Sequence, residues 1–323
     1  AGVLPMKART EPTPEPLDKL GTQPRRRVNR SDHALEAPLL QERGLEFHTL
    51  RQRFLMPALA HGIMIAALLV IIFPVFYAVI LSTQSPAEYY QYPPDLTPGS
   101  SLVENYGTAW RRVNLGRLVA NTTFIAVAVS VGKIFLSIVA AFAFVYFDFR
   151  GKAFFFAMIL ITHMLPLPVR IVPTFELMDQ FGWVNTFYAL TIPFFASATG
   201  TLLFQQLYQT VPPSLADAAR IDGAGPLQFL WHVLIPVSRT NIAALFLIEF
   251  IYMWNQYLWP LIVANAETTR VVQIGIKQLI ATDAAVDWAV VMAGTVVAMI
   301  PPLIVLLILQ GSLIKGLALQ EEK

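Results

Sequence analysis

Residues 212–236 read PPSLADAARIDGAGPLQFLWHVLIP and lie between two long apolar runs of the chain. The stretch contains charged residues, glycines and four prolines, a composition that is typical of a connector with defined turns and helix ends. Ser214 and Asp217 have the spacing of a capping box, in which side chains at a helix start bond free backbone N–H groups. We therefore predict that a helix starts with Ser214 as its cap and continues through Ile221.

Three further residues predict where the helices of this stretch end or begin. Gly223 supplies the left-handed conformation that ends a helix, and Pro226 suits the first turn of a second helix. Pro236 is expected to break that second helix. The simplest interpretation of two short, rigidly bracketed helices is an amphipathic connector that lies on the lipid headgroups.

The composition indicates the class of protein. Of 323 residues, 55 % are hydrophobic and 14 % are charged, and the mean hydropathy is +0.56, which is typical of a polytopic membrane protein. The chain has no cysteine, which excludes disulfides and thiolate metal sites, and its five histidines show no metal-ligand spacing. It also lacks a GxxxxGK[ST] motif, so it does not bind ATP through a P-loop of its own.

Apolar runs predict where the chain crosses the membrane. A helix needs about 20 apolar residues to span a hydrocarbon core of ~30 Å. We interpret residues 1–53, which are polar and rich in proline and arginine, as a disordered cytoplasmic tail, and residues 54–323 as one transmembrane domain. Six runs in that domain qualify or nearly qualify as spans: about 55–81, 118–147, 153–172, 186–208, 241–263 and 288–312.

The distribution of charge predicts the orientation of these spans. With a cytoplasmic N-terminus and six crossings, the cytoplasmic segments hold sixteen of the 23 Lys and Arg residues and the external segments hold five. This excess follows the positive-inside rule, although most of it comes from the N-terminal tail. Both termini and the connector at 206–240 are therefore predicted to be cytoplasmic, and the loops at 82–117 and 264–287 external.

The connector also carries a longer pattern. Asp217-Ala218-Ala219 is followed after three residues by Gly223, and after nine more by Val233-Leu234-Ile235-Pro236. This spacing resembles the EAA loop of the membrane subunits of ABC importers, with Asp in place of the first Glu. In that family the loop is a coupling helix that docks in a cleft of a separate ATP-hydrolysing subunit. The resemblance implies that the ATPase-coupling residues are Ser214, Asp217, Ala218, Ala219, Arg220, Asp222, Gly223 and Pro236.

Other motifs extend the resemblance over about residues 55–323. The run from Trp254 to Leu261, WNQYLWPL, is similar to the WNxxxWPL signature of maltose-permease-like sugar importers. Several motifs more narrowly resemble the second permease subunit of bacterial importers for sn-glycerol-3-phosphate or glycerophosphodiesters. These motifs are Met164-Leu165-Pro166, Val169-Arg170-Ile171, Ala198-Thr199, residues 218–224 and Gly275-Ile276-Lys277.

The resemblance implies an all-α integral membrane fold, the six-transmembrane-helix permease domain of a type I (MetI-like) importer. It further implies a non-catalytic subunit that pairs with a homologous permease in the bacterial inner membrane, rests on two ATP-binding subunits, and receives solute from an extracytoplasmic binding protein. The chain itself would bind no cofactor, because ATP and Mg belong to the ATPase; it would contact membrane lipid and no nucleic acid. It would form half of an alternating-access pathway for sn-glycerol-3-phosphate or a glycerophosphodiester.

Three alternatives have to be weighed against this interpretation. Most of the motifs are shared with importers of neutral sugars or oligosaccharides, so such a solute is the alternative substrate. A secondary transporter driven by an ion gradient would need inverted repeats with broken helices, and the sequence shows no convincing internal repeat. A membrane-embedded enzyme would need a catalytic or metal-binding group of residues within the spans, which the sequence does not offer.

Three charged residues lie within the predicted spans: Lys133, Arg170 and Glu249. A charge at the centre of a span costs about 2.5–3.5 kcal/mol on insertion scales, so each of them needs a partner. Lys133 and Glu249 are suited to pair inside the bundle as architecture, whereas Lys133 or Arg170 is suited to line a pathway for a phosphate-bearing solute. Glu249 is a further candidate for that pathway, because its carboxylate could meet a cationic head such as choline. Asn255 and Trp259 are also candidates, with packing at the membrane interface as the alternative for the tryptophan.

Overall fold

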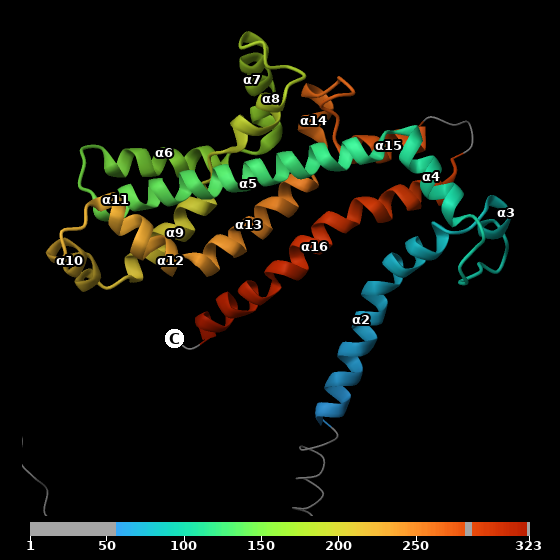
Figure 1. Cartoon of the computed structure of the whole chain (residues 1–323), viewed down its shortest axis with the longest axis horizontal. Helices are drawn as coiled ribbons and strands as arrows, with labels where there is room; N and C mark the ends of the chain where they lie inside the picture. Colours follow the sequence, from blue (N-terminus) through green and yellow to red (C-terminus); the bar gives the residue numbers. More distant parts are fainter. Residues whose placement is uncertain (1–55, 282–285, 322–323) are drawn as a thin grey trace, which may run out of the picture. The chain divides into compact units, whose positions relative to one another are not determined.

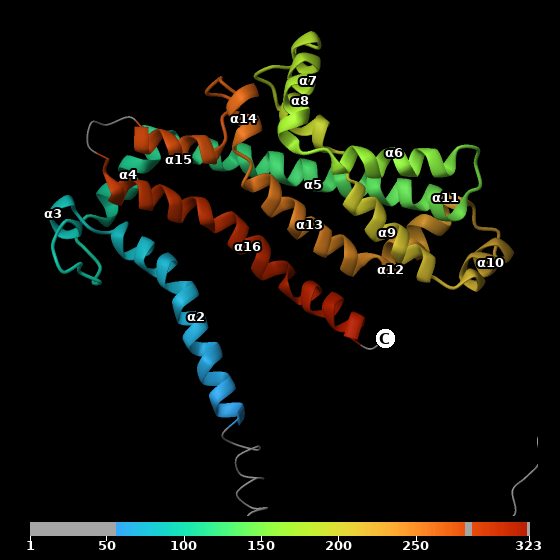
Figure 2. The ribbon, with the colours of Figure 1, turned by 180° about the vertical axis from the view of Figure 1, so that it is seen from behind.

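The computed structural model describes residues 56–281 and 286–321, and every regular element in these two ranges is a helix (Figures 1 and 2). The predicted all-α fold is therefore confirmed. The tail predicted at residues 1–53 lies outside the described residues.

The chain divides into two compact units, residues 1–70 and 71–323. The helix α2 (Met56–Leu81), which contains no Asp, Glu, Lys or Arg, begins in the first unit and ends in the second. The other described helices belong to the second unit. They are α3 (Pro86–Tyr89), α4 (Leu102–Arg112), α5 (Leu115–Tyr146), α6 (Lys152–Met164), α7 (Leu167–Gln180), α8 (Phe187–Thr191), η2 (Ile192–Phe194), α9 (Ala198–Thr210), α10 (Pro213–Ile221), α11 (Pro226–Phe229), η3 (Leu230–Leu234), α12 (Ile235–Val237), α13 (Arg239–Trp254), α14 (Leu258–Val263), α15 (Val272–Ala281) and α16 (Trp288–Glu321).

The segment between α2 and α5 is held together by a buried side-chain amide. Asn105 of α4 donates hydrogen bonds from Nδ2 to Ser82 O at 3.0 Å and to Gln84 O at 2.9 Å. These bonds satisfy backbone carbonyl groups of the turn that follows α2. The amide thereby fixes the direction in which the chain leaves α2.

The long helix α5 is the axis of the second unit. Its 32 residues pack along α9 and α13, and α13 packs in turn on α16 (Figure 1). Half of the most apolar 18-residue window of α5 is buried by other parts of the chain. About one side of this helix is therefore covered by protein, and polar residues on that side can be satisfied by neighbouring helices.

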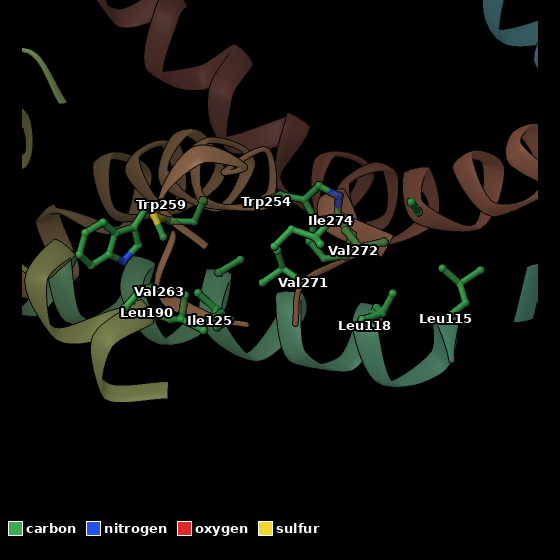
Figure 3. Packing of buried hydrophobic residues seen from close by; sticks show 14 of the residues in the cluster. Leu115, Leu118, Ile125, Leu190, Trp254, Trp259, Val263, Val271, Val272 and Ile274 are labelled. Carbon is green, nitrogen blue, oxygen red and sulfur yellow. The ribbon is translucent and has the colours of Figure 1, made fainter. Parts of the chain in front are cut away.

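Two clusters of buried side chains hold the second unit together. The larger cluster surrounds the first half of α5, where Leu118 and Ile125 pack with Trp254, Trp259 and other residues of α13 to α16 (Figure 3). The smaller cluster surrounds the second half of α5 and joins it to α9 and to the 212–236 connector. Lipid tails are as apolar as these side chains, so the clusters are stabilised mainly by close van der Waals packing, which anchors both halves of α5.

The predicted third span is interrupted. The apolar run at 153–172 is divided between α6 and α7, and the break falls at Leu165 and Pro166. Leu165 has φ −71° and ψ 120°, the extended conformation that proline imposes on the residue before it. Arg170 consequently lies in the first half of a separate helix.

The fourth and fifth predicted spans are bent or shortened. The run at 186–208 forms α8, η2 and α9 with a bend of 40°, and α13 is joined at 74° to the helical segment Pro226–Val237. The apolar run at 241–263 does not form one continuous helix, because α13 ends at Trp254. Both the backbone N–H and the Nδ2 of Asn255 donate to Ile251 O, at 3.2 and 2.8 Å, so this side chain competes with the helical backbone.

By length and composition, three of the described helices can cross a membrane, and up to five spans result if each bent pair is counted as one. The segment Lys152–Ile161 is a shorter apolar helix. The total of six crossings stays a prediction.

Candidate functional site

The 212–236 connector starts differently from the prediction. Ser214 is not the N-cap of α10, because the helix begins at Pro213 and its N-cap position is Pro212, without a side-chain cap. Proline suits the first helical position, since its fixed φ matches the helix and its missing N–H would have no partner there. Asp217 bonds Arg220 instead, with Nη1 donating to Oδ1 at 3.3 Å. Both side chains are exposed, so this pair contributes only about 0.3–0.5 kcal/mol.

The helix α10 ends next to Gly223, as the sequence predicts. Gly223 has φ +76° and directly follows Asp222, the C-cap residue. The N–H of Gly223 donates to Arg220 O at 3.0 Å, and the N–H of Ala224 donates to Ala219 O at 2.8 Å. These two bonds form a Schellman motif, which satisfies the last carbonyl groups of the helix and stops it from fraying.

The second helix of the connector begins at Pro226, as predicted, but Pro236 does not end it. The helix continues through a π-helical turn at Leu230–Leu234 and then through α12, which contains Pro236. In a regular α-helix the ring of Pro236 would clash with the carbonyl of His232, four residues earlier. His232 lies inside the wider π-helical turn, which changes this spacing. The chain bends only at Ser238, whose Oγ donates to Leu234 O at 2.6 Å.

The connector has one face on the bundle and one face in solvent. Ala216 and Ala219 pack against the smaller hydrophobic cluster, and the buried ring of Phe229 meets that of Tyr146 edge to face at 5.3 Å. The opposite face of α10 carries exposed side chains, and Ile221 is 86 % exposed. The exposed residues of this face and of the adjoining turn include Ser214, Leu215, Asp217, Ala218, Arg220 and Asp222.

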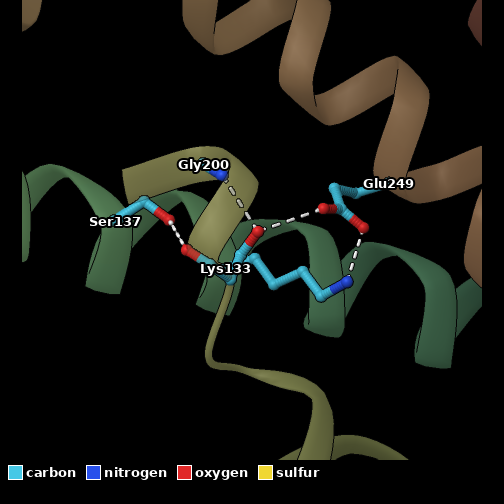
Figure 4. A network of polar contacts seen from close by, with 5 residues as sticks. Lys133, Ser137, Gly200 and Glu249 are labelled. Carbon is cyan, nitrogen blue, oxygen red and sulfur yellow. Dashed lines mark hydrogen bonds and ion pairs between the residues drawn. The ribbon is translucent and has the colours of Figure 1, made fainter. Parts of the chain in front are cut away.

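Lys133 of α5 and Glu249 of α13, two of the charged residues within the predicted spans, meet inside the bundle. Lys133 Nζ lies 2.5 Å from Glu249 Oε2, and each residue is only 7 % exposed (Figure 4). The ammonium group also lies 5.1 Å from the centre of the Tyr252 ring, a cation–π distance. The pair predicted from the sequence is thus present, and it neutralises both charges.

A residue that the sequence analysis did not single out completes this cluster. Ser197, at the bend before α9, donates from Oγ to Glu249 Oε1 at 3.3 Å and accepts from the N–H of Gly200 at 3.1 Å. It is therefore the N-cap of α9 and the link between that bend and the ion pair. A serine directly before an apolar helical run is the signal that predicts such a cap.

The remaining pathway candidates lie in different surroundings. Arg170 is exposed on α7 and lines a cavity of about 290 Å³ together with Ser197. Asn255 is exposed and lines a second cavity, of about 330 Å³, beside Gln273. Trp259 is 1 % exposed and its Nε1 donates to Ala189 O at 2.9 Å, which is the position of a core residue and not of one that lines an aqueous pathway.

Comparison with known families identifies the group to which these features belong. Residues 100–318 match the family described as the binding-protein-dependent transport system inner membrane component. The chain belongs to this family. It is therefore a multi-pass inner-membrane component of a transport system, and the 212–236 connector lies within the matched region.

Several members of this family are similar to the chain over nearly their whole length. The sn-glycerol-3-phosphate transport system permease protein UgpE of Rhizobium meliloti (strain 1021) is 43 % identical over 272 residues, which cover 82 % of this chain and 96 % of that protein. The proteins of the same name from Brucella melitensis and Agrobacterium fabrum are each 42 % identical, and cover 84 % and 82 % of this chain and 100 % and 96 % of their own lengths.

Solved structures show the same fold. A bacterial ABC transporter involved in the import of the acidic polysaccharide alginate is 26 % identical, with a TM-score of 0.70 and coverage of 81 % of this chain and 97 % of that one. The alginate ABC transporter in complex with an alginate pentasaccharide-bound periplasmic protein gives a TM-score of 0.59 at 14 % identity, covering 81 % and 94 %. The second likeness concerns the fold alone.

Proposed function

We propose that this chain is a membrane-spanning permease subunit of an ATP-driven importer for sn-glycerol-3-phosphate or a glycerophosphodiester. The observation that carries the proposal is the 43 % identity, over 96 % of its length, with a permease named for sn-glycerol-3-phosphate transport. The proteins of that name do not favour the alternative of a neutral sugar or oligosaccharide. The chain forms half of an alternating-access pathway and leaves ATP hydrolysis to a partner.

The partners follow from this role. A homologous permease subunit supplies the other half of the pathway, two copies of an ATP-binding subunit hold ATP and Mg, and an extracytoplasmic protein delivers the solute. The connector and both termini face the cytoplasm, where the ATPase binds.

The geometry of α10 supports its role as the coupling helix. A helix that transmits motion from the ATPase has to be rigid. Ala219 packs α10 against the smaller hydrophobic cluster, and the hydrogen bonds around Gly223 keep its last turn from fraying. Its other face is exposed and free to enter a cleft of the ATPase. We assign ATPase contacts to Ser214, Asp217, Ala218, Arg220 and Asp222, and shape-keeping roles to Ala219, Gly223 and Pro236.

The membrane-embedded residues divide into two groups. Lys133 and Glu249 neutralise one another in a buried pair, which supports an architectural role. Arg170 and Asn255 are exposed at cavities, which supports contact with the solute on its way through the pathway.

Uptake by the reconstituted complex tests the proposal. Proteoliposomes that contain both permeases and the ATPase, supplied with the binding protein, should accumulate radiolabelled sn-glycerol-3-phosphate only when ATP is enclosed. Radiolabelled maltose serves as the neutral control solute, and an ATPase variant that cannot hydrolyse ATP serves as the energy control. Accumulation of maltose alone, or uptake driven by an ion gradient without ATP, would refute the proposal.

A further inference from the structure

The cavity that contains Arg170 opens beside the bend between η2 and α9. It has a volume of about 290 Å³, and its described walls come from α5, α6, α7, η2, the bend and the first turns of α9. Its polar lining consists of Arg170 and the hydroxyl groups of Ser137, Ser197 and Thr201, and the rest of its lining is apolar. Small-molecule sites typically begin near a volume of about 300 Å³, with an apolar lining and a few polar groups that orient the ligand.

Arg170 gives this cavity its charge. Among the described residues that line it, no other is charged, and no hydrogen bond or ion pair joins the guanidinium to another described residue. Lys133, by contrast, is neutralised by Glu249 at 2.5 Å. An arginine within a predicted span is costly without a partner, so the guanidinium is suited to a partner that arrives from elsewhere and carries negative charge.

The hydroxyl groups that line the cavity differ in how strongly they already hydrogen-bond to other groups of the protein. Thr201 Oγ1 donates to Ser197 O at 2.8 Å, and Ser197 Oγ donates to Glu249 while it accepts from Gly200. Ser137 Oγ makes only a long contact of 3.4 Å with Ser197 O (Figure 4). Because a hydroxyl hydrogen rotates freely, Ser137 can turn its hydrogen into the cavity at little cost.

We infer that this cavity is the subsite for the phosphate group of the solute, with Arg170 as its recognising residue and Ser137 as a second donor. The inference rests on the proposed function, which supplies a phosphate-bearing solute. A planar guanidinium donates two parallel N–H bonds to phosphate oxygens, and apolar walls lower the local dielectric and strengthen those bonds. The subsite thus selects an oxyanion over a neutral solute of the same size.

Variants of the reconstituted complex test the subsite. Arg170→Met should reduce the uptake of sn-glycerol-3-phosphate at least tenfold, because a charge-assisted bond is lost. Arg170→Lys should reduce it less, since lysine keeps the charge and loses the two-pronged geometry. Ser137→Ala should reduce it about two- to tenfold. Recovery of the assembled complex, measured for every variant, should not change. The matched control is Arg117→Met, which removes an exposed arginine of α5 outside the cavity and should stay within twofold of wild type.

The outcomes separate this inference from the proposed function. A wild-type complex that does not transport sn-glycerol-3-phosphate refutes the proposed function. Wild-type transport together with undiminished transport by Arg170→Met overturns the subsite alone. Failure of Arg170→Met, Arg170→Lys and Arg170→Gln to assemble also overturns it, because the arginine then serves packing.

Phosphate oxyanions also occur in lipid headgroups, so a second measurement separates the two sources. The melting temperatures of the wild-type and Arg170→Met complexes are compared in detergent with and without added phospholipid. Occupancy by the solute predicts the same response to lipid in both proteins. Stabilisation of the wild type alone by lipid, with equal uptake by the two proteins, assigns the arginine to a headgroup and overturns the solute subsite.

Discussion

Single residues decide the shape of the connector. Gly223 is held at φ +76° by the two hydrogen bonds that close α10, and a residue with a Cβ resists this region of backbone conformation. A Cβ added there would find no atom within 4 Å, so any penalty for a substitution comes from the backbone and not from crowding.

Gly223→Ala is therefore expected to lower the free energy of unfolding of the connector by about 1–2 kcal/mol. Hydrogen exchange of the amides of α10 measures this loss, and the ATP hydrolysed per solute transported should rise with it. Gly225→Ala is the matched control, because Gly225 has φ −71° and its added Cβ would meet only Gln228 Oε1 at 3.8 Å. Equal protection of α10 in wild type and Gly223→Ala would contradict the assignment.

The buried ion pair makes a second prediction at this scale. Removing one partner of a buried pair leaves an unpaired charge and costs about 3–5 kcal/mol, whereas replacing both partners with neutral groups is far less costly. Lys133→Met and Glu249→Gln should each lower the melting temperature of the purified complex, and the double variant should recover a large part of the loss. Additive effects in this double-mutant cycle would show that the pair does not couple α5 to α13.

At the scale of elements, the contact between α5 and α9 depends on a missing side chain. A Cβ on Gly200 would overlap Ser137 Oγ of α5 and approach Leu245 Cδ2 of α13 to 2.9 Å. Gly200→Ala should therefore force the helices apart and destabilise the complex by about 1–3 kcal/mol. Gly311→Ala, where nothing lies within 4 Å of the added Cβ, should be neutral or stabilising. Equal melting temperatures for the two variants would contradict this account.

The short helix α3 gives a prediction for pH. The N–H of Ser85 donates to Glu88 Oε2 at 2.7 Å and lowers the pKa of Glu88 below its ordinary value of 4.5. A lowered carboxyl pKa stabilises the folded loop above the unfolded value, and this contribution is lost as the pH falls through the folded pKa. Protection of the amides at 85–90 in wild type relative to Glu88→Gln should therefore shrink below pH 4.5. If the extra amide protection of wild type over Glu88→Gln stays constant to lower pH, the Glu88 carboxylate does not stabilise this loop.

For the molecule as a whole, the sequence predicts periodic and charged features better than local breaks. Apolar runs predict the helical class, and the cost of buried charge indicates the Lys133–Glu249 pair as one of two alternatives, between which the structure decides. The end of α13 lies at Asn255, whose side-chain amide bonds Ile251 O, and an apolar run does not reveal this. The start of α10 was misplaced because a proline at the first helical position outweighed the Ser214 cap. The role of Ser197 needs three elements to meet, which only the structure shows.

The topology of the whole molecule can be tested by cysteine labelling, because the native chain contains no cysteine. An impermeant maleimide should label Ser100→Cys from outside and Ser214→Cys only in inverted vesicles, since the connector is proposed to be cytoplasmic. Added ATPase should then protect Ser214→Cys, because we propose that the exposed face of α10 enters the cleft of the ATPase. Arg150→Cys, on the same side but outside the connector, should stay accessible. Labelling of Ser214→Cys from outside would overturn the orientation, and labelling undiminished by the ATPase would remove α10 from the coupling interface.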